Sequence, residues 1–432
     1  MRGKLKIIRC PVHGDMEFPL KLVKLIDTPE FQRLRGVHQL GTAYYVYPGA
    51  VHSRFEHSLG TCWLTSQMLA RLKVELSAQE RLAILAAALV HDVTHIPFGH
   101  TLEDERRLFE RHDTPERVKS FLPRGELGKA LKELKLLDRV LQFLLDGSLW
   151  QNQIFAGAVA SDLLDYLARD AFHCGLSQRY DSRILQLFRL SGGSEPQLYL
   201  EAQKEGVVRQ DALSEIIHLL RIRYFLSERV YFHHTKTVSG AMMSRAVEAA
   251  VSEGLTLDDI AGRTDEGLLS LLEFRYGDIP AVRHLLTGLR GRRLYKRVYL
   301  LTADLSLQRR QDFVEKYHVS AQDRAYAEAA VARSCGLEPE DLILYCPALK
   351  MQLKQAHLPV KIDDGPCRML DELPVDEIGV LQERHRRLWR FYIFLNPAKM
   401  KVAEKVAKAC EAYFGESNHL TKFQSGQLFL GL

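Results

Sequence analysis

The sequence predicts a mainly α-helical protein that ends in a smaller α+β lobe. Three observations lead to this fold class. Apolar residues recur with helical spacing almost throughout residues 58–190. A second block of the same pattern occupies residues 210–253, and short helices continue to residue 291. After residue 291, short β-branched and aromatic runs replace the helical pattern, which indicates strands.

Composition restricts the class of protein. A chain of 432 residues with 46% hydrophobic and 26% charged residues has an ordinary globular composition and room for two or three domains. Its net charge of +5 is small, which argues against a dedicated nucleic-acid binder. No apolar run reaches 18 residues, so we expect no membrane partner. The seven cysteines form no CxxC pair, which fits a reducing, cytoplasmic location.

The N-terminal elements follow from local signals. Residues 4–20 read as a short strand and turn. A helix is predicted to start at Asp27, the expected N-cap, because Pro29 and Glu30 follow at early helical positions. Residues 41–49 are rich in tyrosine and are expected to be extended.

A buried central helix is predicted over residues 78–89. Its apolar and small side chains would let it pack closely among other helices. It ends directly before His91 and Asp92, and His95 and His100 follow within nine residues. Imidazole and carboxylate groups therefore gather where this helix ends.

The C-terminal lobe is expected to begin near residues 288–293, which divides the chain into residues 1–290 and residues 291–432. Its β-branched and aromatic runs and its amphipathic helix indicate α+β structure. The expected strands are residues 297–301, 342–345 and 391–395, and the expected helix is residues 398–413.

Two histidines and two aspartates, His57, the adjacent His91 and Asp92, and Asp162, form the main chemical motif. Their order resembles the ligand set of the HD-domain phosphohydrolases, so the resemblance implies an HD-domain helical core. Neutral imidazoles with carboxylates suit Mn, Fe, Mg or Zn, without a choice between these metals. Taken alone, His57 would more often be a hydrogen-bonded core residue.

Other residues add to this motif. Asp162, Tyr166 and Asp170 recur at i, i+4 and i+8 without an intervening lysine, which favours the wall of a site over a solvated helix face. His112 and Asp113 offer an imidazole beside a carboxylate, suited to protonating a leaving group. The alternative for His112 is an exposed residue at a helix start.

Several stretches together are similar to the HD-domain deoxynucleoside triphosphate (dNTP) triphosphohydrolases, namely residues 26–29 and 31–35, 39–41, 44–46, 48–50, 54–60, 91–92, 97–98, 165–166 and 168–170. The resemblance implies hydrolysis at the α-phosphorus, with release of deoxynucleoside and intact triphosphate. It assigns the metal to His57, His91, Asp92 and Asp162, and the general acid to His112 with Asp113 beside it. Arg54, His95 and His100 would face the phosphates, Gln39, Tyr166 and Asp170 the deoxyribose, and Arg223 and Tyr231 the triphosphate or sugar.

The resemblance also implies regulation. Regulated members of the family bind an activating nucleotide at a subunit interface, so a homo-oligomer (dimer, tetramer or hexamer) is expected. The matching positions are Lys6, Ile7, Asp27, Gln32, Arg35, Arg292 and Lys296. Alternatively, Asp27 only caps a helix and the arginines are only solvated.

The sequence also departs from the family pattern. Leu163 stands where relatives often carry a phosphate-binding lysine, and Thr94, Asp113, Phe232 and His234 replace other usual residues. These changes keep two alternatives open. One is an HD phosphatase or phosphodiesterase acting on another nucleotide. The other is a nucleotide sensor or nucleic-acid binder with a vestigial site, for which the basic run 384–390 would supply contacts.

Overall fold

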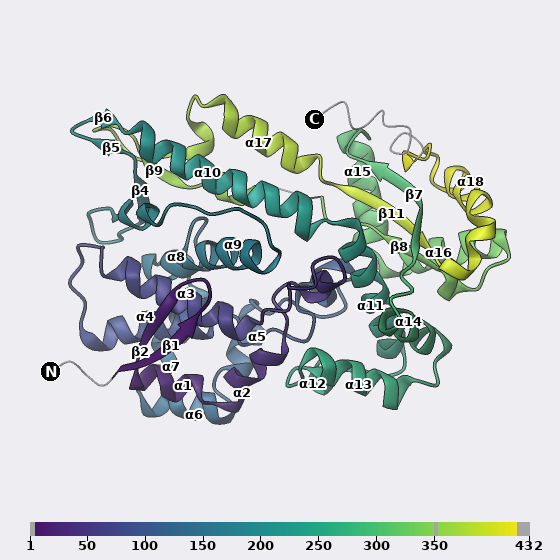
Figure 1. Cartoon of the computed structure of the whole chain (residues 1–432), viewed down its shortest axis with the longest axis horizontal. Coiled ribbons are helices and arrows are strands. Elements are labelled where there is room, and N and C mark those ends of the chain that lie inside the picture. The colour runs from purple at the N-terminus through teal and green to yellow at the C-terminus, as the bar shows by residue number, and fades with distance from the viewer. Residues whose placement is uncertain (1–4, 350–352, 421–432) are drawn as a thin grey trace.

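The computed structural model describes residues 5–349 and 353–420 and confirms the mainly helical fold class. Figure 1 shows two halves that a long helix, α10, connects across the top of the molecule. The N-terminal hairpin and the first nine helices form one half. A small three-stranded sheet with its own helices lies in the other half. The two ends of the predicted domains, residues 1–4 and 421–432, lie outside the described residues.

The N-terminal hairpin forms where strand and turn were predicted. Strands β1 (Leu5–Cys10) and β2 (Gly14–Pro19) pair antiparallel and lead into α1 (Leu20–Ile26). The predicted N-cap is wrong, because Asp27 ends α1 and Thr28 precedes α2 (Pro29–Gln32). The Asp-Thr-Pro-Glu pattern marks a helix start, but it does not tell which of two adjacent polar residues precedes the helix.

The tyrosine-rich segment is not extended as predicted. A 3₁₀ turn, η1 (Arg33–Gly36), is followed by a second one, η2 (Gly41–Tyr45). The rings of Tyr44 and Tyr45 lie 4.6 Å apart, and the Tyr45 hydroxyl donates to the Leu289 carbonyl. Aromatic composition resembles that of a strand, but here packing against a distant helix determines the backbone.

Helices α3 (Arg54–Leu69), α4 (Ala78–Val90) and α9 (Ser161–His173) form the centre of the N-terminal half. α4 is the predicted central helix, and every residue from Leu82 to Val90 is buried. α3 packs against both α4 and α9. Shorter elements surround them: η3 (Thr101–Glu105), α5 (Pro115–Phe121), α6 (Gly125–Glu133), α7 (Leu137–Leu145), α8 (Trp150–Ala156) and η4 (Ser182–Gln186).

The second helical block also forms, with one interruption. α10 (Gln210–Leu226) continues through a π-type turn, η5 (Ser227–Tyr231), before α11 (His234–Ser252) begins. The predicted short helices follow as α12 (Leu257–Ile260), α13 (Asp265–Tyr276) and α14 (Pro280–Arg290).

The C-terminal lobe contains the three predicted strands, β7 (Lys296–Thr302), β8 (Leu342–Tyr345) and β11 (Arg390–Leu395), in the antiparallel order β7-β11-β8. The last predicted helix begins as a 3₁₀ turn, η10 (Pro397–Val402), before α18 (Ala403–Phe414). The lobe also contains α15 (Leu307–Phe313), η6 (Val314–Val319), α16 (Ala321–Cys335) and η7 (Pro339–Asp341).

Part of the C-terminal half of the sequence returns to the N-terminal core. Strand β9 (Pro359–Lys361) pairs parallel with β4 (Leu198–Glu201), and α17 (Asp376–Arg386) packs against α10. The predicted division near residue 290 stays a prediction. The other small elements are β3 (Phe188–Leu190), β5 (Gln203–Lys204), β6 (Val207–Val208), β10 (Arg368–Met369), η8 (Lys354–Ala356) and η9 (Leu370–Glu372).

Within the described residues, none of the helices is both long and apolar enough to span a bilayer. All seven cysteines are described, and all are free thiols.

Candidate active site

Three elements of the N-terminal core bring the four predicted metal ligands together. His57 lies in the first turn of α3, and Asp162 lies in the first turn of α9. His91 and Asp92 directly follow the last residue of α4. The start of α3 is fixed by a capping box in which the Ser53 backbone N–H donates to the Glu56 carboxylate.

The ligand atoms face one another. The His57 Nε2 atom lies 2.9 Å from Asp162 Oδ1 and 3.8 Å from Asp92 Oδ2. The His91 Nε2 atom lies 3.5 Å from Asp92 Oδ1 and 3.8 Å from Asp162 Oδ1. It is buried and has no hydrogen-bond partner. Ligand atoms of His57, His91 and Asp92 all lie within 4.8 Å of one another, so the donor set fits a divalent cation.

The other nitrogens of the two imidazoles are held by outer contacts. His57 Nδ1 donates to Asp165 Oδ2 at 2.8 Å, since a carboxylate can only accept, and His91 Nδ1 lies 2.9 Å from the Ala88 carbonyl oxygen. Both contacts leave Nε2 as the ligand atom. Sequence reasoning gave Asp165 no role. Its spacing of three residues from Asp162 was the available signal.

The ionisable side chains of the site shift one another's pKa values. Burial lowers the pKa of His57, but the hydrogen bonds and charges of Asp162 and Asp165 outweigh it and raise that pKa to about 10. Burial opposes ionisation of Asp92, but the cationic Arg54 beside it holds its pKa well below the usual range. Arg54 Nη1 donates to Asp92 Oδ2 at 2.6 Å. The site therefore keeps its carboxylates ionised inside the protein.

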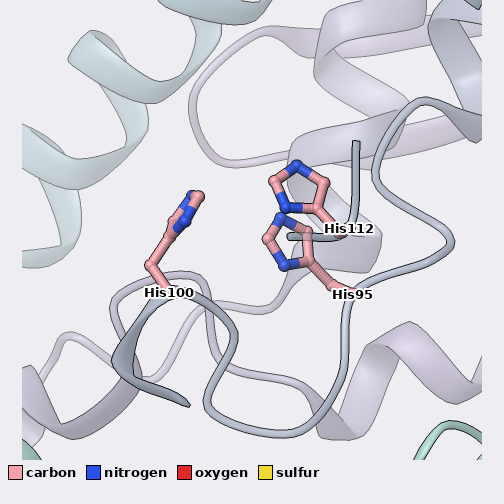
Figure 2. A group of neighbouring side chains, drawn as sticks. All are labelled: His95, His100 and His112. Atoms are coloured by element: carbon pink, nitrogen blue, oxygen red, sulfur yellow. The ribbon is translucent and has the colours of Figure 1, made fainter. Parts of the chain in front are cut away.

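A second group of side chains lies beside Asp92. Figure 2 shows the rings of His95 and His112 one over the other, with His100 facing them. The centroids of the stacked rings are 3.4 Å apart. His95 Nε2 lies 3.3 Å from Asp92 Oδ1, and both ring nitrogens of His95 lack a hydrogen-bond partner. Burial lowers the pKa of His95 to about 3, so this imidazole is neutral.

Glu103 faces all three of these histidines. Its Oε2 atom accepts from His112 Nδ1 at 3.0 Å and lies 3.6 Å from His100 Nδ1. Its Oε1 atom lies 3.6 Å from His95 Nδ1. Glu103 therefore takes the position that the sequence assigned to Asp113. The Asp113 side chain lies outside the buried cluster, where it is 56% exposed and pairs with Arg111.

The residues predicted to contact sugar and triphosphate also come together. The Tyr231 hydroxyl donates to Asp170 Oδ2 at 2.7 Å, and the Arg223 guanidinium lies over the rings of Tyr231 and Tyr166, at 4.8 and 5.3 Å. Gln39 joins this group through its backbone N–H, which donates to the His52 carbonyl. His52, to which no role was assigned, bonds to Asp170 Oδ1 at 2.8 Å.

Two residues outside the predicted set hold the loop that carries His95 and His100. Phe98 and Gly99 have φ angles of 57° and 45°, a left-handed pair in which the non-glycine residue is strained. The Asp265 carboxylate accepts from the Phe98 N–H at 2.7 Å. Arg33 donates to the His95 carbonyl at 2.8 Å. Both contacts come from far along the chain, so no local sequence signal marks them.

The predicted regulatory residues do not form one cluster within the chain. Lys6 and Ile7 lie on β1, whereas Arg292 and Lys296 lie at the end of α14 and the start of β7, in the other half of Figure 1. Ile7 is 60% exposed. Four others have contacts within the chain. Asp27 ends α1, Gln32 donates to the Ile26 carbonyl, Arg35 lies over the Phe55 ring, and Arg292 donates to the Tyr45 carbonyl of the N-terminal half.

Comparison with protein families matches two descriptions. The HD domain matches residues 54–170, and the HD-associated region matches residues 200–423. The first range contains the four predicted ligands and the histidine cluster. The second contains Arg223, Tyr231 and the predicted regulatory positions Arg292 and Lys296.

Individual relatives cover most of the chain. An uncharacterized protein of Methanocaldococcus jannaschii is 28% identical over 406 residues, which cover 92% of this chain and 80% of that protein. The deoxynucleoside triphosphate triphosphohydrolase SAMHD1 is 28% identical in Mus musculus and 26% identical in Homo sapiens, each over 79% of this chain. The chain spans 60% and 62% of the length of those two enzymes.

Among solved structures, the chain resembles the crystal structure of a phosphohydrolase from Bacteroides thetaiotaomicron. The TM-score is 0.69 at 22% identity, and the match covers 90% of this chain and 99% of the other. At that identity the likeness shows the fold alone.

Proposed function

Because the chain belongs to the family that combines an HD domain with an HD-associated region, we propose that it hydrolyses deoxynucleoside triphosphates to deoxynucleoside and triphosphate in a metal-dependent reaction. The family and the relatives support a phosphohydrolase as the coarser statement. The observation that carries the proposal is the convergence of His57, His91, Asp92 and Asp162 from three elements beside the Asp170 and Tyr231 group.

The four ligands would hold one divalent cation: Mn, Fe, Mg or Zn. The buried, unpartnered His91 Nε2 atom and the close ionised carboxylates support this binding. A bound divalent cation activates water for attack and polarises a phosphoryl oxygen. Asp165 and the Ala88 carbonyl orient the two imidazoles, and Arg54 neutralises part of the charge of Asp92.

The remaining predicted residues act on the nucleotide. His112, oriented by Glu103, is the proposed general acid for the leaving group. Burial lowers the pKa of His112, and an approaching anionic phosphate favours the protonated ring again. His95 and Arg54 both contact Asp92, and the His100 ring faces the His95 ring. These three residues are proposed to face the phosphates.

The opposite wall is proposed to select the sugar. Tyr166 and Asp170 lie one helical turn apart on α9, and Gln39 approaches through His52. Hydrogen bonds and the Arg223 cation fix Asp170 and Tyr231, so this wall is rigid. A rigid wall can exclude a 2′-hydroxyl, and Arg223 can contribute positive charge to a bound triphosphate.

We also propose nucleotide regulation in a homo-oligomer. Lys6, Ile7, Asp27, Gln32 and Arg35 lie in the N-terminal half, whereas Arg292 and Lys296 lie beyond α14. We propose that the activating nucleotide contacts the two groups on different copies of the chain.

Product analysis tests the proposed reaction. The purified full chain is incubated with each dNTP alone, and with all four mixed, in Mn or in Mg, and the products are separated by chromatography. We expect deoxynucleoside and intact triphosphate in equal amounts. Turnover only in the mixture would support nucleotide activation. Release of phosphate or pyrophosphate, or no turnover in any condition, would contradict the proposed reaction.

One observation favours a second candidate, an HD phosphatase or phosphodiesterase that acts on another nucleotide. Leu163 is 2% exposed and packs in the hydrophobic core, so its position offers no cation to a triphosphate. The same incubation with nucleoside monophosphates and cyclic nucleotides distinguishes this candidate. Turnover of those compounds without turnover of dNTPs would favour it.

A further inference from the structure

We propose that His13, in the turn between β1 and β2, is a positioning residue for the metal centre and acts through Asp165 on His57. This inference rests on the metal-dependent function proposed above. His13 carried no assigned role in the sequence, where it was only part of a turn. In the folded chain it lies next to a residue that contacts a metal ligand, although 152 positions separate it from that residue.

Asp165 is the centre of the contact. Its side chain is fully buried, and its Oδ2 atom accepts from His57 Nδ1 at 2.8 Å. Arg169, one helical turn later on α9, donates to both oxygens at 2.8 Å. His13 Nε2 lies 2.6 Å from Oδ1, and its side chain is 10% exposed. The side chains of His13, Asp165 and His57 therefore form a continuous series of contacts from the hairpin to the ligand set.

The turn makes a second contact with the same ion pair. Cys10, the last residue of β1, is buried, and its Sγ atom lies 3.6 Å from Arg169 Nη2. Met16 and Phe18 of β2 pack the hairpin against the hydrophobic core, and each is 1% exposed. The turn therefore covers the Asp165 and Arg169 pair from one side, and its position is set by the protein core.

Physical chemistry explains why the outer contact matters. An ionised carboxylate can only accept hydrogen bonds, so each of its partners must donate. Two partners on Oδ1 and two on Oδ2 leave the Asp165 carboxylate one orientation. That orientation directs His57 Nδ1–H away from the site and Nε2 toward Asp162 and Asp92. Outer partners of this kind fix the ring of a ligand histidine, and their loss weakens metal binding by about tenfold to a hundredfold.

His13 also lies at a surface pocket. A pocket of about 960 Å³ on the other face of α9 is lined by His13, Ala168, Phe172 and His218, among others. His218 shares this pocket but bonds to the Arg179 carbonyl and has no contact with Asp165. The chain thus offers a matched control: the same residue type in the same pocket, without the link to the metal centre.

The experiment measures Mn²⁺ binding to the full-length chain by calorimetry, together with kcat and KM for dNTP. The variants are His13→Leu, which removes the donor, His13→Gln, which retains an N–H donor at a similar reach, and His218→Leu as the control. Thermal unfolding of each variant verifies folding. Because His13 is one contact further out than Asp165, we expect His13→Leu to weaken Mn²⁺ binding by about threefold to tenfold. His13→Gln and His218→Leu should bind within about twofold of the wild type.

The outcomes separate this inference from the proposed function. Wild-type affinity in His13→Leu would overturn the positioning role. Equal losses in all three variants would also overturn it, because they would indicate pocket packing rather than the donated hydrogen bond. If the wild-type chain itself binds no divalent metal, the proposed function fails, and that result is distinct from a normal His13→Leu variant in a metal-binding protein.

Discussion

At the scale of single residues, the carboxylate that faces His112 is Glu103 and not its neighbour in sequence. We expect Glu103→Gln to lower kcat by roughly tenfold to a hundredfold, because a neutral amide orients the imidazole and stabilises its charge less well. Asp113→Asn should stay within about twofold of the wild type, since Asp113 pairs with Arg111 outside the cluster. Steady-state kinetics at saturating dNTP measures both.

Metal binding serves as the control for this pair of variants. Neither Glu103 nor Asp113 belongs to the ligand set, so both variants should bind Mn²⁺ with nearly wild-type affinity. A large kcat loss in Asp113→Asn with normal turnover in Glu103→Gln would restore the assignment made from sequence.

Glu105 predicts a pH dependence of stability. Burial raises the pKa of its carboxyl group from the ordinary 4.5 to about 7, although Lys236, a hydrogen bond from Ser244 and Arg106 oppose this. A folded-state pKa above the unfolded one means that stability is full below about pH 4.5 and decreases as pH rises through about 7. At pH 8 Glu105→Gln should therefore unfold at a higher temperature than the wild type, with a free energy of unfolding larger by about 1–3 kcal/mol.

The comparison at low pH completes this test. Near pH 4.5 the wild-type carboxyl group is largely protonated in the folded chain, so the variant and the wild type should have similar stability. Thermal unfolding across this pH range gives the difference directly. A difference that does not change with pH would show that Glu105 does not titrate as described.

At the scale of elements, the approach of α3 to α9 depends on Gly60. A Cβ atom at this position would lie 1.8 Å from Asp165 Oδ1. We expect Gly60→Ala to destabilise the protein by about 1–3 kcal/mol and to weaken metal binding, because Asp165 must move. Gly379 in α17 has no atom within 4 Å of such a Cβ. Gly379→Ala should stabilise by about 0.5–1 kcal/mol, as alanine favours a helix.

Denaturant unfolding of these two glycine variants measures both signs. The prediction is an opposite effect of the same substitution at two helical positions. A neutral Gly60→Ala with unchanged Mn²⁺ binding would mean that the two helices separate at little cost.

At the scale of the whole molecule, buried charges join the two halves. Arg106, directly after η3, binds Glu248 of α11 at 2.7 Å and also Glu328 of α16. Arg324 of α16 binds Glu248 at 3.1 Å. The Arg106 and Glu328 side chains are 3% and 1% exposed. We expect Arg106→Leu to destabilise the fold by about 3–5 kcal/mol, because it leaves buried carboxylates without their partner.

Arg290 provides the matched control for Arg106. It also binds two glutamates, Glu266 and Glu273, but its side chain is 43% exposed. Arg290→Leu should cost no more than about 1 kcal/mol. Denaturant unfolding compares the two variants, and equal losses would show that burial of the Arg106 network is not what matters.

Assembly is the second prediction at this scale. Under the proposed regulation, a nucleotide shared by the two regulatory groups joins copies of the chain. We expect light scattering to show a larger mass in the presence of a dNTP mixture than in its absence. Arg35→Ala with Arg292→Ala should reduce this increase. An unchanged mass in the wild type would contradict regulation by assembly.

Local pattern accounts for much of the fold. The buried α4, the hairpin turn and the three strands of the C-terminal lobe were predictable because helical and alternating periods are short-range properties of the chain. Two predictions of local structure were wrong, for different reasons. Asp27 and Thr28 compete for one cap, and the tyrosines of η2 follow a distant helix rather than their own β preference.

The sequence by itself determined the fold class. Together with the family resemblance it also identified the residues to consider as metal ligands, because those residues occupy the positions of a motif that can be read along one chain. Only the tertiary structure decided their partners. Glu103 beside His112, Asp265 under Phe98, His52 on Asp170 and His13 on Asp165 depend on how the elements pack. A hydrogen bond needs two atoms about 3 Å apart. Three of these pairs are more than 100 positions apart in the sequence and Glu103 and His112 are nine apart, and in each pair the atoms reach that distance only in the folded chain.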